Sequence, residues 1–497
     1  MNKVIKGMKD NYFIIFILLL AVILRFAGYL DRLNVSVDQG RDALIGLESI
    51  HLLRAPLLGP PSSSWGFNFG PLYYYIIIFF TAVIPGIFSP WIGFTLLSIL
   101  SVFLAYLIGI NSRGKTFGLV LSLITAISFA EIVNSANLLN TSLVSFAVFL
   151  SFYGASAYFK FQHNKYLVLL GFGIALALHA HLQALPLALL LLSPLLLSHA
   201  HKILPKIHAI LLSIVGFGLG MLPLIIFEFQ HSLAWSKSLL DYATFGQYRF
   251  YTPVRWLTDL TVFWPSRFGE ILWGSSALGL YFSLFVFVSL AFYTFRKKLD
   301  KISLLAILVF ILEILSIRNY RGPRSPEYLI FTHFFIIYLF ALAVTFVVEG
   351  RRVLTVLVCL LLLLAGLSFD RSIYIQKSQS AETLTLFNFV KEQIRQPVSL
   401  YIFSGSYENA FSLYYFLSRS HLISESGYPL ALCDNGDKYG QVPDRCPFSY
   451  RLFSTGRFVL FDFHPENLHN FSQFEAGVID PFKLYRRTYN NYELIKY

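Results

Sequence analysis

Apolar residues come in long blocks along this chain, and short polar segments separate the blocks. A helix rises 1.5 Å per residue, so a block of about 17–20 apolar residues can cross the hydrocarbon core of a bilayer. The pattern predicts a polytopic α-helical membrane protein with about eleven transmembrane helices. The spans are expected near residues 12–30, 91–110, 116–134, 142–159, 166–180, 182–198, 207–226, 273–295, 302–318, 328–347 and 353–369.

The basic residues of the short segments indicate how these spans are oriented. Three lysines precede the first block, which is too long for a signal peptide and lacks a small-residue cleavage site. We therefore expect a retained anchor with its N-terminus in the cytoplasm. Alternate loops are also basic, and they hold Arg113 and Lys115, Lys160 and Lys165, Lys202 and Lys206, Arg296, Lys297, Lys298 and Lys301, and Arg351 and Arg352.

All of these loops fall on the side of the N-terminus only if the apolar block 72–88 does not cross the membrane. This block is therefore predicted to be an interfacial or re-entrant helix that begins after Pro71. The opposite side then receives a first outer loop at 31–90, the segments 227–272 and 319–327, and the tail.

The tail after residue 370 is polar and has a different pattern. Candidate strands at 398–403 and 457–463 surround a helical pattern at 407–419. This order predicts a small extracytoplasmic α/β domain at 371–497, beside a membrane domain at 1–370. Cys433 and Cys446 lie in the tail, either as a disulfide in an oxidising compartment or as two free thiols.

Composition excludes several classes of protein. Of the 497 residues, 56% are hydrophobic and only 13% are charged, which is too little charge to cover a soluble protein of this size. The formal net charge is +12, but the basic residues lie in loops between spans, so the bilayer is the expected partner and nucleic acid is not. The pairs at His179 and His181 and at His199 and His201 fall on opposite membrane sides without nearby carboxylates, so no metal site is assigned.

The first outer loop carries the strongest candidate for catalysis. Asp38, Asp42 and the apolar positions that follow them suit amphipathic helices at the membrane surface. Asp38 falls in the first turn, where the helix N-terminus alone would stabilise a carboxylate. The alternative is a general base that faces a substrate arriving from the lipid. Asp42 is either a substrate contact or an ordinary surface charge.

Other ionisable groups cluster at the outer ends of spans. A charge at mid-membrane costs roughly 2.5–3.5 kcal/mol, so such groups usually face a cavity or pair with one another. Arg318, Arg321 and Arg324 could together hold a phosphate, although contact with lipid headgroups is the simpler explanation. The weaker cavity-lining candidates are Glu228, Glu327 and His333.

Several motifs resemble one family. Val37-Asp38-Gln-Gly-Arg-Asp42-Ala-Leu is followed by Ala55-Pro-Leu-Leu-Gly-Pro-Pro-Ser and by Phe69-Gly-Pro-Leu-Tyr-Tyr-Tyr75. Further agreement comes from Leu178-His-Ala-His181, Gly220-Met-Leu-Pro223 and Pro326-Glu-Tyr328. Residues 10–370 thus resemble bacterial relatives of the protein O-mannosyltransferases. These are family 39-like members of the GT-C glycosyltransferase superfamily, which also includes the aminoarabinose lipid A transferases.

The resemblance implies transfer of a sugar from a polyprenyl-phosphate donor to a glycan, lipid or protein outside the cytoplasm, in a bacterial inner membrane. Asp38 takes the place of the catalytic aspartate, which activates the acceptor for inverting displacement. Arg321 and Arg324 are then expected to contact the phosphate. Asn140 is expected to contact the sugar, and Tyr74 to line a lipid-facing entrance.

Two departures from the family pattern bear on this expectation. Gln39 stands where the family often has Glu, and Asn140 stands where some relatives carry an acidic residue. Both weaken the case for a metal, so a metal-independent transferase is expected, with a divalent metal left open. The alternatives are a transporter or flippase of lipid-linked saccharides and a non-catalytic envelope-assembly protein. Transporters usually have paired repeats and polar groups near mid-membrane, whereas this chain shows no repeat and puts its polar groups on one face.

Overall fold

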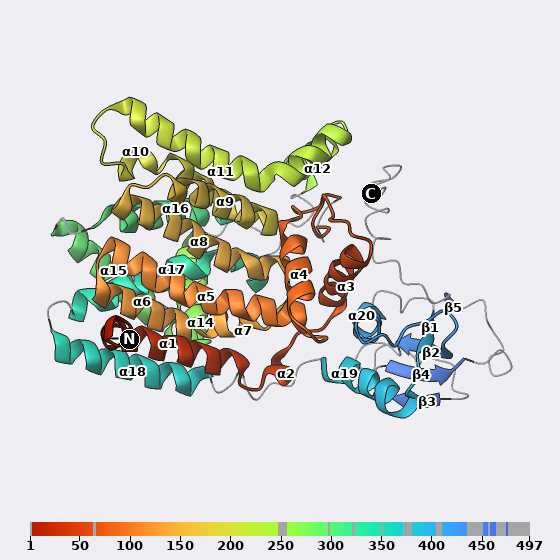
Figure 1. The fold of residues 1–497 in the computed structure, drawn as a ribbon. Helices are drawn as coiled ribbons and strands as arrows, with labels where there is room; N and C mark the ends of the chain where they lie inside the picture. Colours follow the sequence, from red (N-terminus) through yellow and green to blue (C-terminus); the bar gives the residue numbers. More distant parts are fainter. Residues whose placement is uncertain are drawn as a thin grey trace.

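The computed structural model describes residues 2–62, 66–246, 256–296, 299–320, 324–348, 351–370, 373, 380–403, 410–434, 451–455, 458–463 and 474–475. Helices fill the larger part of the molecule and run roughly parallel to one another, and a smaller layer of strands lies beyond one end of them (Figure 1). The main helices of the bundle are α1 (Asn2–Phe26), α5 (Ser89–Ser112), α6 (Lys115–Ile127), α7 (Phe129–Ser135), α8 (Asn140–Phe161), α9 (Lys165–Ala180), α11 (Ile203–Gln230), α14 (Trp264–Trp273), α15 (Gly279–Phe295), α16 (Lys301–Asn319), α17 (Thr332–Val348) and α18 (Arg352–Asp370). Shorter helical segments join them, namely α2 (Tyr29–Arg32), η1 (Leu182–Leu192), α10 (Pro194–Leu197), α12 (Ala234–Thr244), α13 (Trp256–Thr258), η3 (Asp259–Phe263), η4 (Ser276–Leu278) and η5 (Pro326–Leu329).

Each predicted span coincides with apolar helix. Among the described residues, five helices are at least 18 residues long and apolar enough to cross a membrane. The pair α6 and α7, which bends by 58° at a short break, is either a sixth, broken span or a re-entrant loop. The other five predicted spans are occupied by apolar helices of 10–17 residues. The structure is therefore that of a polytopic membrane protein, although not every helix reaches the length of a full span.

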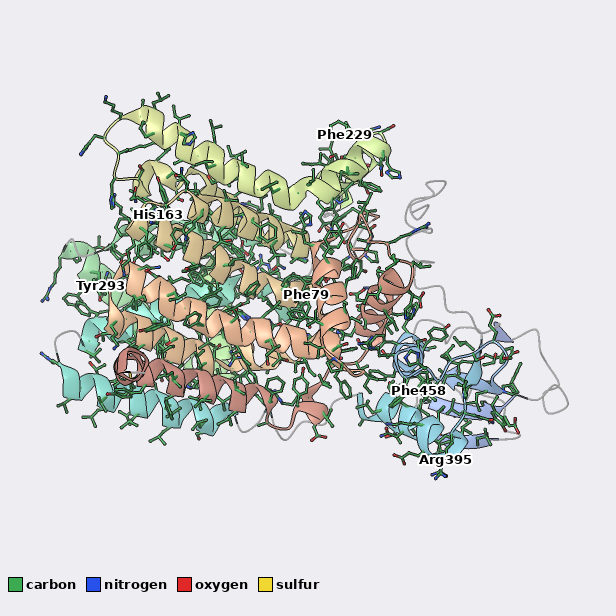
Figure 2. All side chains as sticks on the ribbon, viewed as in Figure 1. Phe79, His163, Phe229, Tyr293, Arg395 and Phe458 are labelled. Carbon is green, nitrogen blue, oxygen red and sulfur yellow. The ribbon has the colours of Figure 1, made fainter. Side chains whose placement is uncertain are left out.

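The outer surface of the bundle is apolar. Phe229 on α11 is 84% exposed, and Phe79 on α4 (Leu72–Val83) is 58% exposed (Figure 2). Large aliphatic and aromatic side chains are exposed along α11, α15 and α18 as well. A soluble protein rarely exposes so much contiguous apolar surface, whereas contact with lipid tails requires it.

The loops predicted to share one membrane side do meet at one end of the bundle. Arg113, at the end of α5, forms an ion pair of 2.9 Å with Asp300, just before α16. Lys160 donates to the carbonyl of Ile110, and Lys301 donates to the carbonyl of Leu196. These contacts tie three of the basic loops together, while Lys297 and Lys298 lie outside the described residues.

At the opposite end, α3 (Val37–His51) and α4 (Leu72–Val83) lie across the bundle (Figure 1). The twelve residues of α4 span roughly 18 Å, well short of a hydrocarbon core. The block 72–88 therefore does not cross as a single helix, as predicted.

The helix predicted in the first outer loop is present as α3, but it is more deeply buried than an amphipathic helix on a membrane surface would be. Ten of its fifteen residues are buried, on more than one face. One side packs on α4, where Gly46 leaves room for Ile77. The other side is covered by α20 (Phe411–Arg419) of the tail. The polar face therefore faces protein, which the periodicity of α3 alone does not reveal.

The tail builds a mixed sheet with the strand order β3-β4-β2-β1-β5. Its strands are β1 (Val398–Phe403), β2 (Tyr428–Asp434), β3 (Arg451–Ser454), β4 (Phe458–Asp462) and β5 (Phe474–Glu475), and its helical segments are α19 (Ser380–Phe389), η7 (Val390–Ile394) and α20. The pair β1 and β2 is parallel, and α20 forms the crossover between them. The two predicted strands correspond to β1 and β4. Cys433 is buried in β2, whereas Cys446 lies outside the described residues.

The helix α20 fastens the tail to the first outer loop. The hydroxyl of Ser412 donates to the carbonyl of Ser36, at the start of α3, over 2.9 Å. Arg419 donates to the carbonyl of Thr81 on α4 over 2.8 Å. The ring of Tyr415 packs on Trp91 with centroids 5.8 Å apart. One helix of the tail therefore contacts both helices of the loop.

Gly40 sets how closely α20 approaches α3. A Cβ at Gly40 would lie 2.1 Å from Oγ and 2.6 Å from Cα of Ser412, so backbone would have to move. We expect Gly40→Val to cost about 1–3 kcal/mol of stability through overpacking. Amides of α20 should then exchange with deuterium faster. Gly66→Val is the control, because nothing lies within 4 Å of its Cβ position. Equal exchange in the two variants would contradict this packing role.

Candidate active site

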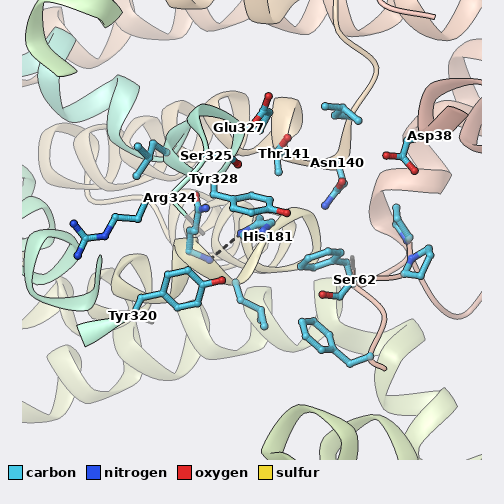
Figure 3. A pocket seen from close by; sticks show the side chains of 18 of the residues that line it. Asp38, Ser62, Asn140, Thr141, His181, Tyr320, Arg324, Ser325, Glu327 and Tyr328 are labelled. Atoms are coloured by element: carbon cyan, nitrogen blue, oxygen red, sulfur yellow. Dashed lines mark hydrogen bonds between the residues drawn. The ribbon is translucent and has the colours of Figure 1, made fainter. Parts of the chain in front are cut away.

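A cavity of about 730 Å³ opens where α3 meets the ends of the bundle helices. Its walls come from α3, the loop before α4, the start of α8, η1, α12, the end of α16 and η5. Four of the predicted site residues line it, namely Asp38, Asn140, Arg324 and Glu327. Figure 3 shows Asp38 on one side of the cavity and Arg324 on the other, with Asn140 and Tyr328 between them.

Asp38 lies in the first turn of α3 and keeps access to the cavity, since its side chain is 57% exposed. It does not cap the helix. That position belongs to Ser36, whose backbone N–H donates to the side-chain oxygen of Gln39. The amide of Gln39 donates in turn to Asn137 over 3.1 Å. The residue that replaces the family's usual Glu thus fixes the start of the helix and leaves the Asp38 carboxylate available.

Beneath Asp38 lies a buried polar network that includes two residues predicted to meet substrate. Arg41 bridges Asp38 at 2.7 Å and Asp42 at 2.8 Å. The hydroxyls of Tyr73 and Tyr74 each donate to Asp42 over 3.0 Å. Burial lowers the pKa of Arg41 less than the carboxylates of Asp42 and Asp38 raise it, so the guanidinium stays charged. Asp42 and Tyr74 are fully buried in this network and do not line the cavity.

Arg324 lies across the cavity with its guanidinium turned away from the centre (Figure 3). It forms an ion pair of 2.8 Å with Asp259, and Arg318 lies 4.0 Å from the same carboxylate. The Nε atoms of both arginines are buried without a hydrogen-bond partner. Each of these two N–H groups can therefore still donate a hydrogen bond at this wall of the cavity. Arg321, the third member of the predicted cluster, lies outside the described residues.

Aromatic side chains that the sequence did not single out form much of the wall. The ring of His181 stacks on Tyr328 with centroids 5.1 Å apart, and Phe69 packs on its other side at 4.9 Å. The hydroxyls of Tyr242 and Tyr320 share a hydrogen bond of 2.9 Å. Flat rings with polar edges are well suited to contact a sugar or an isoprenoid chain. Asn140 is held beside them by donating to the carbonyl of Ala180.

Two predicted residues lie away from the cavity. Glu228 accepts hydrogen bonds from the backbone N–H groups of Trp235 and Ser236, so it caps the first turn of α12. His333 is buried on α17, and its Nδ1 lies 2.8 Å from a carboxylate oxygen of Glu131. The same oxygen accepts a hydrogen bond from Ser145. Both predicted residues are thus engaged by protein groups outside the site.

No cluster of three His, Cys, Asp or Glu side chains suited to a metal occurs in the part of the chain that the structure describes. The close-spaced histidines are separated as predicted, because His179 accepts from the backbone N–H of Leu72 near the cavity, whereas His199 packs on Phe159 at the end of α8. The ring of His179 also contacts the sulfur of Met221. His179 therefore has an ordinary interior role, whereas His199 lies on the surface.

Comparison with known proteins relates the fold to solved structures. No protein-family model and no curated protein sequence matches the chain. The fold is similar to that of ArnT from Cupriavidus metallidurans in the apo state, with a TM-score of 0.60, 12% identity, and coverage of 91% of this chain and 98% of that one. ArnT bound to undecaprenyl phosphate gives a TM-score of 0.58 at the same identity and coverage. The oligosaccharyltransferase of Archaeoglobus fulgidus is less similar, with a TM-score of 0.49, 12% identity, and coverage of 91% and 62%. ArnT is a GT-C aminoarabinose lipid A transferase, so the resemblance seen in the motifs extends to the fold.

Proposed function

We propose that this chain is a membrane glycosyltransferase that moves a sugar from a polyprenyl-phosphate donor to a hydroxyl group of an acceptor. The observation that carries the proposal is the accessible carboxylate of Asp38 in a large cavity at the end of a bundle of membrane helices. The similarity to ArnT, which has been solved with undecaprenyl phosphate, supports a lipid phosphate as the donor.

In the proposed reaction, Asp38 takes the proton of the acceptor hydroxyl, and the oxygen attacks the anomeric carbon of the donor. The bond from that carbon to the phosphate oxygen breaks as the new glycosidic bond forms, and polyprenyl phosphate leaves with the electron pair. Displacement from the opposite face inverts the anomeric centre. General-base assistance of this kind contributes about 10²–10⁴-fold in rate. Arg41 orients Asp38 through their contact of 2.7 Å.

The leaving phosphate needs a cationic partner, and Arg324 is the described candidate. Its guanidinium now pairs with Asp259, and a bidentate phosphate would compete for the same donors. Asn140 would contact the sugar, and Glu327 lies exposed at the rim, where the acceptor would arrive. The acceptor is a glycan, lipid or protein outside the cytoplasm of a bacterial cell, and the proposed chemistry needs no metal.

The proposal is tested with purified protein in lipid vesicles, supplied with labelled undecaprenyl-phosphate sugars and membrane extracts as acceptors. Transfer of the label to an acceptor, with release of undecaprenyl phosphate, is the expected result. If the label instead crosses the bilayer still attached to its lipid, the protein is a flippase. Failure to bind any lipid phosphate would point to the non-catalytic alternative.

The phosphate contact gives a separate prediction. Arg324→Gln should weaken binding of undecaprenyl phosphate by about tenfold, because one charge-assisted hydrogen-bond pair is lost. Asp259→Asn should act in the opposite direction, because it removes the carboxylate that competes for the guanidinium. The affinity of each variant for undecaprenyl phosphate is measured by fluorescence competition in nanodiscs and compared with that of the wild type. An unchanged affinity in Arg324→Gln would move the phosphate site elsewhere.

A further inference from the structure

The cavity wall contains one carboxyl group that the proposed reaction does not use. Glu313 lies on α16, a turn and a half before the helix ends, and it is fully buried. It nevertheless belongs to the residues that line the cavity, so it lies at a narrow end of that space. Its neighbours along the wall are Ser316, Ile317 and Tyr320.

Glu313 differs from the other buried acids of the molecule. Asp42 accepts from an arginine and two tyrosines, Glu131 accepts from Ser145 and pairs with His333, and Asp259 pairs with Arg324. Both carboxylate oxygens of Glu313 are buried, and neither has a hydrogen-bond partner among the residues that the structure describes. Such a group costs several kcal/mol in any protein interior. An ionisable residue at membrane depth that is not satisfied by protein is characteristic of a ligand site.

We infer that Glu313 binds the glycosyl group of the lipid-linked donor by accepting hydrogen bonds from two of its polar hydrogens. One carboxylate offers two oxygens side by side, which matches a pair of O–H or N–H donors on adjacent ring carbons. Sugars present such pairs, whereas an isoprenoid chain and a phosphate present none. This inference rests on the proposed function and adds a residue that recognises the sugar from the α16 wall of the cavity.

The geometry around Glu313 favours a sugar over the alternatives. A hydrocarbon chain would leave both oxygens unpaired, and a phosphate would add a second negative charge beside the first. A structural role predicts a protein partner, yet neither oxygen has one in the described part of the chain. The stacked rings of His181 and Tyr328 line the same cavity and supply the flat apolar faces that sugar rings pack against.

The test compares binding of undecaprenyl phosphate with binding of undecaprenyl-phosphate glucose, galactose and an amino-pentose to the full chain in nanodiscs. The wild type should bind at least one sugar-bearing lipid about 10- to 100-fold more tightly than the bare lipid phosphate. Glu313→Ala should abolish this preference. Glu313→Gln should keep part of the preference, because one side-chain oxygen still accepts a hydrogen bond. The part that it keeps should be smaller for the lipid that carries the amino sugar than for lipids whose sugars offer a pair of hydroxyls. Bare undecaprenyl phosphate should bind all variants equally.

Two further readouts separate this role from a structural one. Glu313→Gln should melt at the same temperature as the wild type or higher, since it relieves an unpaired buried carboxylate. Ser316→Ala, one turn along the same wall, is the control and should keep the preference. The inference is overturned if the wild type binds all lipids equally, if Glu313→Ala keeps the sugar preference, or if Glu313→Gln is strongly destabilised. If the wild type binds neither the bare nor the sugar-bearing lipids, the proposed function itself fails, and the inference with it.

Discussion

Replacing Asp38 by Asn is expected to lower the turnover of sugar transfer by about two to four orders of magnitude while the donor still binds. The amide has nearly the same shape but cannot take the acceptor's proton. Arg41 keeps its second partner in Asp42, so the helix should keep its place. Turnover is measured with saturating donor under single-turnover conditions, and donor affinity is measured separately.

The matched control for Asp38→Asn is Glu48→Gln, which removes a carboxylate from the same helix. Glu48 lies near the end of α3, contacts only His51 among the charged groups described, and does not line the cavity. Its loss should leave turnover within about threefold, because exposed ion pairs contribute little. If Asp38→Asn transfers sugar as fast as the wild type, the base is another residue and the proposed mechanism is wrong.

Asp42→Ala should be the most destabilising single substitution in the site. It leaves the Arg41 guanidinium buried beside Asp38, which is itself largely exposed, and it removes the hydrogen bond that the Tyr74 hydroxyl donates to Asp42. Breaking a buried ion pair from one side typically costs about 3–5 kcal/mol. The expected result is a large fall in melting temperature in detergent, or a loss of folded protein.

Two companion variants separate charge from packing. Tyr74→Phe removes one neutral donor and should cost about 1 kcal/mol. The double variant Arg41→Met with Asp42→Leu removes both charges together and should recover most of the stability, because the desolvation cost disappears with them. It should not recover full turnover, since Asp38 loses Arg41. A stable Asp42→Ala protein would show that this network is not what holds α3 in place.

The apolar pattern predicted the membrane helices well because lipid imposes a fixed period and length on them. The motifs and charge clusters singled out Asp38, Asn140, Arg324 and Glu327, which line the cavity and are local features of the sequence. Sequence reasoning failed where a contact joins distant segments. Tyr74 was expected to line a lipid-facing entrance, yet it is buried and donates to Asp42, because α4 and α20 cover α3 from two sides.

The same limit explains the residues that the sequence did not reveal. Arg41 appeared in the sequence only as a residue of the first outer loop. Its spacing of three from Asp38, which suits an ion pair on one face of a helix, was the only sign of its role. Glu313 lies inside a predicted apolar span, and a single acidic residue there does not change the prediction of a membrane helix. His333 was a candidate, but its partner Glu131 lies 202 residues away, and no pattern in one sequence joins such a pair.

The contact of α20 with α3 bears on how this protein can be altered or recombined. Ser412 rests against Gly40, two residues from Asp38, so the tail and the first loop must match in shape. A chimera that exchanges the tail alone with a distant homologue would meet a foreign surface at the helix that carries the aspartate. Exchange of residues 31–90 together with the tail preserves that fit. The two segments, although far apart in the sequence, are expected to be inherited as a unit.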